Sequence, residues 1–205
     1  MLRIALLAVV LVALAASAVA PYDRTIWFAE VAPVLIAVPL LVATARRFPL
    51  TPLCCVLVAA FALILILGGT YTYARVPLGF TLQEWFDLVR NPYDRIGHFF
   101  QGVTPAIVAR ELLLRTSPLQ PGKWLFTLVT LGCLGISAAY ELIEWLSAVV
   151  WGDGSTEFLG SQGDQWDAQW DMFLALCGAV LAQLAFARLH DRQLGALRPR
   201  GASGA

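Results

Sequence analysis

The segment LCCVLVAAFALILILGGTY (residues 53–71) decides the fold, because it contains no charged side chain over its whole length. A helix needs about 20 mainly apolar residues to cross the hydrocarbon core of a bilayer. Of all 205 residues, 59% are hydrophobic and 14% are charged, and the mean hydropathy is +0.72. This composition is too apolar for an ordinary soluble domain and predicts an integral membrane protein.

Five further segments have a similar apolar length, namely 2–20, 27–45, 96–114, 124–151 and 168–189. We therefore expect an all-α protein, a polytopic transmembrane helix bundle of about six spans. It should form one domain over residues 1–198, followed by a disordered tail at 199–205. Segment 2–20 also resembles a signal peptide, with Arg3, an apolar stretch and Ala18-Val19-Ala20, but Pro21 directly after this site argues against cleavage.

Charged residues are distributed unevenly between the expected loops. If both termini are cytoplasmic, ten of the 14 basic residues lie inside, as the positive-inside rule requires. Glu111 and Asp191 are then the only cytoplasmic acids, and the other twelve acidic residues are at or near the outer side. The ten inner basic residues are Arg3, Arg46, Arg47, Arg110, Arg115, Lys123, Arg188, Arg192, Arg198 and Arg200.

This topology gives the first testable prediction. A reporter fused after Ala205 should report the cytoplasm, and one inserted after Asp87 should report the outer side, because the charge bias sets the orientation of the first spans and of the whole chain. Reporter activity or protease access measured on both fusions checks it. An outward C-terminus would contradict the orientation of every site described below.

Between the third and fourth segments, Thr81-Leu-Gln-Glu84 has the pattern of a capping box and predicts a helix over 81–91. Leu82, Trp85 and Val89 share one face of that helix, so it should lie flat on the outer membrane interface. Two interpretations stay open for this helix: it covers the acidic site, or it only connects two spans.

Small residues suggest how some spans pack. Gly132 and Gly135, followed by Ala138 and Ala139, form a stripe that permits close helix approach and should turn Glu141 toward another helix. The four cysteines all lie inside predicted spans, so we expect free thiols that act as small packing residues. Two prolines inside segment 27–45 should bend that helix.

Acidic and polar residues gather on three helix faces near the outer side. Spacings of three, four or seven residues place side chains on one face of a helix. Charged groups near hydrocarbon are costly and mark candidate functional sites, so we expect these faces to meet in one polar pocket. The faces are Asp94, His98 and Gln101, then Glu141 and Glu144, then Asp164, Asp167 and Asp171.

Such a cluster needs a countercharge, because close carboxylates cannot all be ionised without one. A divalent cation and proton sharing between acids both satisfy this requirement. Mixed His and carboxylate ligands suit Zn, Mn or Fe, and oxygen ligands alone suit Mg or Ca, so the metal is not distinguishable. We assign metal ligation to His98, Glu141, Asp167 and Asp171, a general base to Glu144 or Asp164, anion binding to Arg95, and pocket walls to Trp166 and Trp170.

No other catalytic motif is present, and no basic aromatic patch indicates nucleic-acid binding. The leading hypothesis is a metal-assisted hydrolase or transferase that acts on a lipid or lipid-linked substrate. One alternative is an ion- or proton-coupled transporter. The other is a structural or accessory membrane protein with an ion-stabilised acidic cluster. The sequence does not indicate an oligomeric state.

Four strings of the sequence carry a resemblance to a known family: YDRIGHFFQG (93–102), ARE (109–111), ELIEW (141–145) and GSQGDQWDAQWDM (160–172). They are similar to the YjdF family of bacterial inner-membrane proteins, whose function is unknown. The resemblance covers nearly the whole chain and implies a bacterial inner-membrane location and these candidate positions, but no activity. A looser likeness to VanZ-like membrane proteins rests on an outward acidic residue before an Asp-rich entry into the last helix.

Overall fold

The computed structural model describes residues 1–151 and 161–197, and every regular element in these ranges is helical, which confirms the expected all-α class. The predicted tail at 199–205 lies outside the described residues. In chain order the elements are α1 (Leu2–Ser17), α2 (Arg24–Thr44), α3 (Pro52–Tyr71), the short 3₁₀ helix η1 (Tyr73–Arg75), α4 (Pro77–Trp85), α5 (Tyr93–Thr116), α6 (Lys123–Trp151) and α7 (Asp167–Leu197).

Local sequence signals explain where two of the apolar helices begin. The Asp23 side chain accepts hydrogen bonds from the backbone N–H groups of Thr25 and Ile26 and so caps α2. Thr51 caps α3 in the same way, and Pro52 occupies the first helical position, where its missing N–H costs nothing. Polar residues in the connectors therefore set the ends of helices whose length is set by their apolar runs.

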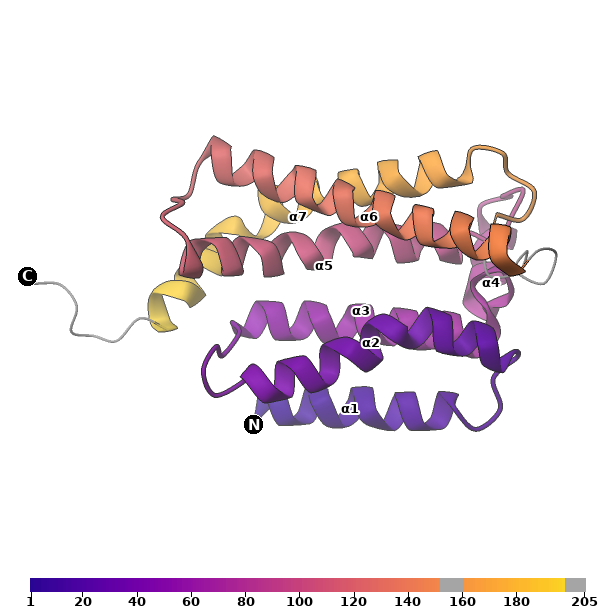
Figure 1. The fold of residues 1–205 in the computed structure, drawn as a ribbon, viewed down its shortest axis with the longest axis horizontal. Coiled ribbons are helices and arrows are strands. Elements are labelled where there is room, and N and C mark those ends of the chain that lie inside the picture. Colours follow the sequence, from indigo (N-terminus) through magenta and orange to yellow (C-terminus); the bar gives the residue numbers. More distant parts are fainter. Residues whose placement is uncertain (152–160, 198–205) are drawn as a thin grey trace, which may run out of the picture.

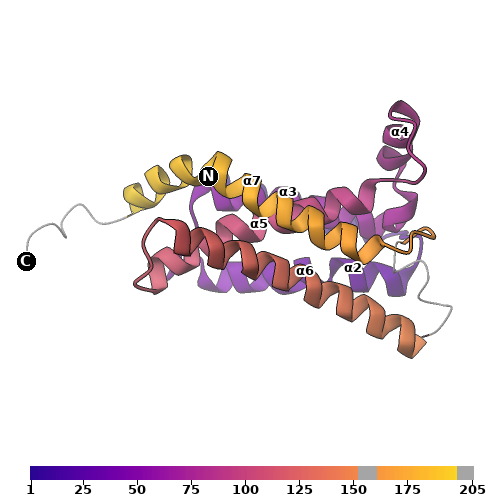
Figure 2. The same ribbon diagram turned by 90° about the horizontal axis from the view of Figure 1, so that it is seen from above.

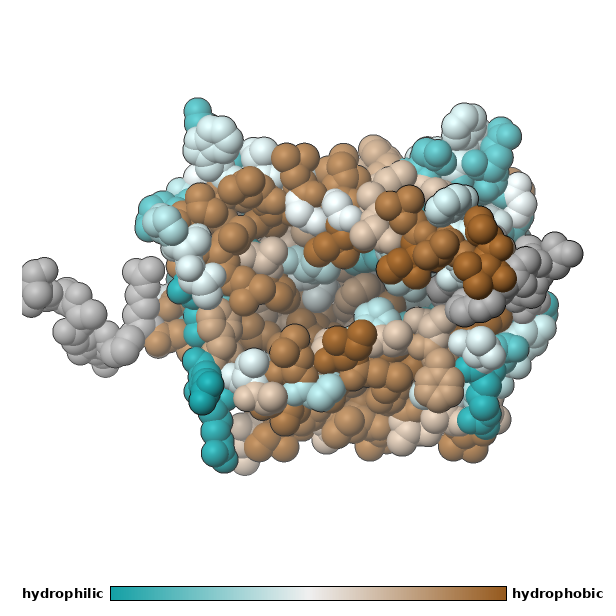
Figure 3. Space-filling view, in the orientation of Figure 1, coloured by the Kyte–Doolittle hydropathy of each residue, from teal (hydrophilic) through white to brown (hydrophobic). Residues whose placement is uncertain are grey.

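Four helices in the described part of the chain are long and apolar enough to cross a membrane, namely α2, α3, α6 and α7. The apolar α1 has only 16 residues, and α5 has 24 but carries several charges. Both run alongside the four in Figure 1, so a total of about six spans stays a prediction. Figure 3 shows hydrophobic side chains over the middle of the bundle and hydrophilic ones at its two ends, as in a membrane protein.

The helices form two groups, α1–α3 and α5–α7, which lie side by side with the N-terminus and the end of α7 at the same end of the bundle (Figure 1). The closest pair is α5 and α7, which cross where Gly102 of α5 lies against the backbone of Ala175 and Gly178 of α7 lies against the backbone of Phe99. Small residues allow this contact because a Cβ at either glycine would overlap a main-chain oxygen.

The stripe at Gly132 and Gly135 does not make such a contact. A Cβ added at either glycine would meet no heavy atom within 4 Å among the described residues, and both positions are exposed on α6. The expectation of close packing along this stripe is therefore wrong. A small-residue pattern shows that a close approach is sterically allowed, but the helix that makes it depends on the tertiary arrangement.

This difference between glycines gives a second prediction. Gly178→Val should lower stability by about 1–3 kcal/mol or more, because the added side chain has to push α7 away from α5. Gly132→Val is the matched control and should change stability little, since its side chain enters open space. Thermal melts of both purified variants check this, and equal effects would contradict the packing described for α5 and α7.

Helix α2 follows a bent path in Figure 1, as predicted from Pro33 and Pro39 inside it. The four cysteines are free, as expected. Cys54 and Cys133 belong to an apolar core where α3, α5, α6 and α7 meet, around Ile107, Val129 and Ala179. A second apolar cluster joins α1, α2, α3 and η1.

Helix α4 corrects the predicted helix over 81–91. It begins four residues earlier, with Pro77 at its first position, and Thr81 lies inside it and donates a hydrogen bond to the Pro77 carbonyl. The helix ends at Trp85, and Asp87 follows in the left-handed region with φ 50°. Pro77 starts this helix because its fixed φ suits the first turn, which leaves no capping role for Thr81. Figure 2 shows α4 running across the bundle axis, the direction of a helix at a membrane surface.

Candidate metal centre

Three helices bring ligand groups together near the beginning of α5. Asp94 and His98 are one helical turn apart on α5, and both are buried. The Nε2 atom of His98 is 3.5 Å from Asp94 Oδ1 and 3.9 Å from Asp171 Oδ2 of α7. One ligand atom from each of the three residues lies within 4.8 Å of the others, which is close enough for all three to coordinate one ion.

The second ring nitrogen of His98 faces hydrogen-bond acceptors. His98 Nδ1 is 3.0 Å from Gln101 Oε1 and 3.7 Å from Glu141 Oε1 of α6. Both of these neighbours accept hydrogen bonds, so Nδ1 can donate its proton to them. Nε2 in turn faces the carboxylates of Asp94 and Asp171, and a metal ion bound there would take the place of an Nε2 proton. A histidine that ligates a metal usually donates its other N–H in this way, which fixes the tautomer and the ring orientation.

Further carboxylates surround this trio. Glu144 of α6 is buried and interacts electrostatically with Asp94 and Asp171. Glu30 of α2 is also buried and interacts electrostatically with Asp94, which sequence reasoning missed because Glu30 stands alone in an apolar segment. Within the described residues, Glu30 Oε2, Glu141 Oε1 and Asp171 Oδ1 are buried without a hydrogen-bond partner. Buried oxygens of this kind indicate a cation or proton that neutralises them.

An arginine network borders the trio on the loop side. Arg90, which sequence reasoning also missed, makes a short ion pair with Asp167, lies 3.5 Å from Asp94 and donates to the Ser161 carbonyl. Arg95 pairs with Asp164 at 2.8 Å, and Asp164 accepts a hydrogen bond from the Trp166 N–H. Neither Asp164 nor Asp167 belongs to the trio of Asp94, His98 and Asp171. Both lie in the arginine network next to that trio.

Of the remaining candidates, Gln101 lies inside the site, and the two tryptophans lie at the surface. Gln101 is buried beside His98 and orients it. Trp166 and Trp170 are 57% and 47% exposed, so their rings lie at the surface, where the Arg95 guanidinium stands 5.6 Å from the centre of the Trp170 ring. Tyr73 of η1 packs against Gly97 of α5, and burial raises the pKa of its phenol, which therefore adds no charge near Glu30.

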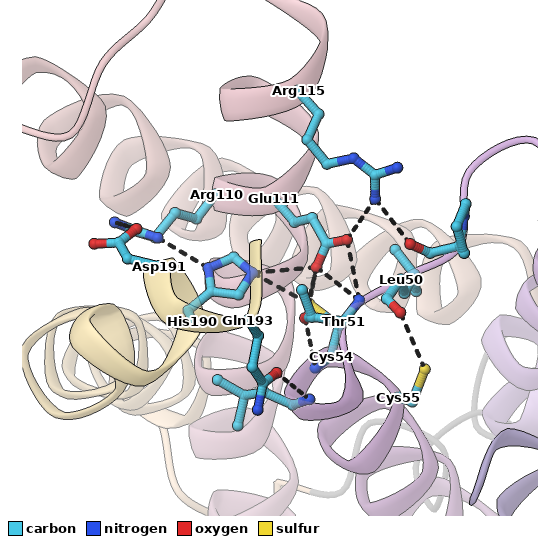
Figure 4. A network of polar contacts seen from close by, with 12 residues as sticks. Leu50, Thr51, Cys54, Cys55, Arg110, Glu111, Arg115, His190, Asp191 and Gln193 are labelled. Atoms are coloured by element: carbon cyan, nitrogen blue, oxygen red, sulfur yellow. Dashed lines mark hydrogen bonds and ion pairs between the residues drawn. The ribbon is translucent and has the colours of Figure 1, made fainter. Parts of the chain in front are cut away.

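A second cluster lies at the other end of α5, and Figure 4 shows it. The Glu111 carboxylate, fully buried, accepts hydrogen bonds from the Thr51 N–H and hydroxyl, from Cys54 Sγ and from His190 Nε2, and it pairs with Arg115 at 2.7 Å. Cys54 is therefore more than the small packing residue that we expected. The cluster joins α3, α5 and α7.

Cys54, Glu111 and His190 also lie close enough together to suggest a metal site. However, Arg110 donates to His190 Nδ1 at 2.9 Å, and arginine is a donor only. The proton of a neutral His190 must therefore be on Nε2, where it is donated to Glu111, and no lone pair is left there for a metal. This cluster is a hydrogen-bonded joint between helices. His98 differs because both of its ring nitrogens face oxygen atoms, and neither contacts an arginine among the described residues.

The bundle and its buried polar ends define a polytopic α-helical membrane protein. Residues 2–192 match the family described as "Predicted membrane protein (DUF2238)", and the chain belongs to this family. It is 54% identical over 176 residues to "Inner membrane protein YjdF" of Escherichia coli (strain K12), covering 86% of this chain and 84% of that protein. The resemblance to YjdF is thereby confirmed, and no solved structure matches the chain.

Proposed function

We propose that this protein binds a divalent cation through Asp94, His98 and Asp171, and uses it for hydrolysis or group transfer on a lipid or lipid-linked substrate. The observation that carries the proposal is the geometry around His98 Nε2, which lies between two buried carboxylates while Nδ1 faces two acceptors. Six carboxylates lie in this region, and the ion pairs among the described residues bring Arg90 and His98 to four of them, while Arg90 is also shared with Asp164. The six are Glu30, Asp94, Glu141, Glu144, Asp167 and Asp171. A cation supplies the missing positive charge.

Three protein ligands are typical of a catalytic metal site, because they leave a coordination position for water or substrate. A divalent cation bound there would supply an activated water at neutral pH. Glu141, whose Oε1 is 3.7 Å from His98 Nδ1, would orient the imidazole from the side opposite the ion. Glu144, buried beside the trio, would accept a proton as the general base. The Arg95 side chain, 31% exposed at the edge of the site, is suited to hold an anionic group of the substrate.

The arrangement of α5 favours an enzyme over a transporter. Between Gln101 and Arg110 its buried residues are mainly apolar, and Val103, Ala106 and Ile107 belong to the apolar core. A proton or ion relay would need polar groups through this region, and transporter sites usually lie near the membrane midplane. Cytoplasmic termini and an outward-facing site follow from the charge bias and remain part of the proposal.

Elemental analysis of the purified protein and calorimetric titration with Zn²⁺, Mn²⁺, Mg²⁺ and Ca²⁺ test the proposal. We expect about one ion per chain, and loss of binding in His98→Ala. Glu144→Gln should keep the metal but lose turnover on the lipid-linked phosphates and esters tried as substrates, since it removes the base and keeps its shape. Metal-free protein that does not bind any of the four ions would overturn the proposal.

A further inference from the structure

An apolar cavity of about 360 Å³ lies between α1, α2, α3 and α5, away from the His98 cluster, and it borders the Glu111 cluster at Leu50 and Cys55. Helices α1 and α2 each pack on α3 but scarcely on each other. The volume lies in the range of small-molecule sites, roughly 300–1,000 Å³. Its walls are almost entirely aliphatic, and they include Leu6, Val34, Ala37, Ala62, Leu65 and Val108.

The cavity runs lengthwise through one half of the bundle. From Cys55 to Leu65 of α3 its wall covers about 15 Å of helical rise. One end lies near Arg3 and Phe48, at the bundle end that holds the N-terminus, and the other lies near Pro33 and Thr104 in the middle. A long hydrocarbon chain matches this elongated, aliphatic space.

The end of the cavity near the N-terminus is basic. Arg3 lines it and donates a hydrogen bond to the Leu50 carbonyl at 2.6 Å. Arg46 and Arg47 are exposed and lie in the chain between the lining residues Ala45 and Phe48. Arg115, which stacks on Phe48 at 3.5 Å, is neutralised by Glu111, whereas Arg3, Arg46 and Arg47 have no carboxylate partner among the described residues. This end therefore has a net positive charge.

We propose that an anionic phospholipid of the leaflet on the N-terminal side binds here, with an acyl chain in the cavity and its phosphate on Arg3, Arg46 and Arg47. The acyl chain restores the dispersion contacts that the cavity walls would otherwise lack. The guanidinium groups attract an anionic headgroup, as basic pockets at the ends of membrane helices do for other anionic lipids. The proposal does not depend on the metal centre, which lies at the opposite end of α5.

The inference is tested by native mass spectrometry of the detergent-purified protein. The protein is titrated with phosphatidylglycerol or with phosphatidylcholine, two lipids that carry identical acyl chains and differ in the headgroup. We expect phosphatidylglycerol to bind more tightly, and Arg3→Gln to weaken it about fivefold or more, since one arginine near an anionic lipid contributes about that factor. Arg24→Gln, at the other end of α1 and α2, is the matched control and should have no effect. Equal affinity for the two lipids would overturn the role of the basic end.

The cavity itself is tested by filling it. Ala37→Phe should abolish lipid binding, and Val42→Phe on the same wall serves as a second variant if the first does not fold. Ala139→Phe adds the same ring on an exposed face of α6 and should leave lipid binding unchanged. Unaltered phosphatidylglycerol binding in a folded cavity variant would overturn the inference. Metal content measured on the same samples should stay unchanged, which separates this result from the fate of the metal centre.

Discussion

Removing divalent cations with a chelator should lower the melting temperature of the purified protein, and readdition should restore it. An ion present at about 1,000 times its Kd stabilises the folded state by about 4 kcal/mol, because it binds only the folded site. Asp171→Asn should abolish this response, since Asp171 is one of the three proposed ligands and is almost fully buried. Glu141→Gln should weaken or abolish it, because its Oε1 is buried beside His98 without a hydrogen-bond partner among the described residues.

The same melts distinguish the metal from proton sharing. If the carboxylates are neutralised by protons alone, the Asn and Gln variants should be as stable as the wild type or more stable, because they relieve repulsion between acids. Glu84→Gln, on the exposed surface of α4, is the control for the loss of one negative charge. A melting curve unaffected by chelation would contradict the metal site only together with metal-free elemental analysis, since a tightly held ion resists chelators.

Glu111→Gln should cost about 3–5 kcal/mol of stability, the usual loss when one partner of a buried ion pair is removed. The carboxylate accepts hydrogen bonds from Thr51, Cys54, His190 and Arg115, and a glutamine amide would point a donor at one of these donors. Chemical denaturation of the purified variant in detergent measures the loss. The effect should be independent of added metal, which separates it from that of Asp171→Asn.

Asp191→Asn provides a matched control at the same end of the bundle. Asp191 accepts a hydrogen bond from Arg110 at 2.7 Å, but its side chain is 44% exposed, so water can replace the lost interaction. Its substitution should cost about 1 kcal/mol or less, the range of exposed ion pairs. Similar losses of stability for Glu111→Gln and Asp191→Asn would show that the cost does not depend on the burial of the carboxylate. That result would contradict the role of Glu111 as a buried joint between α3, α5 and α7.

Several features of the site were accessible from local spacing. Asp94 and His98 are four residues apart, which places them on one helical face whatever the rest of the chain does. The convergence of His98, Glu141 and Asp171 was predicted from the cost of charged groups near hydrocarbon, and their side chains meet in the structure. The reason given for Glu141 was wrong, because the stripe at Gly132 and Gly135 faces open space.

The sequence alone determined that this chain is a bundle of apolar helices, because the length of a membrane helix and its lack of charges are local properties of the chain. Only the tertiary structure decided which polar groups become partners. Glu111 and His190 lie far apart in the sequence and meet because α5 and α7 cross at Gly102 and Gly178. It also separated the two similar clusters, because groups from another helix face each histidine: Arg110 of α5 lies against Nδ1 of His190, whereas Asp171 of α7 lies near Nε2 of His98.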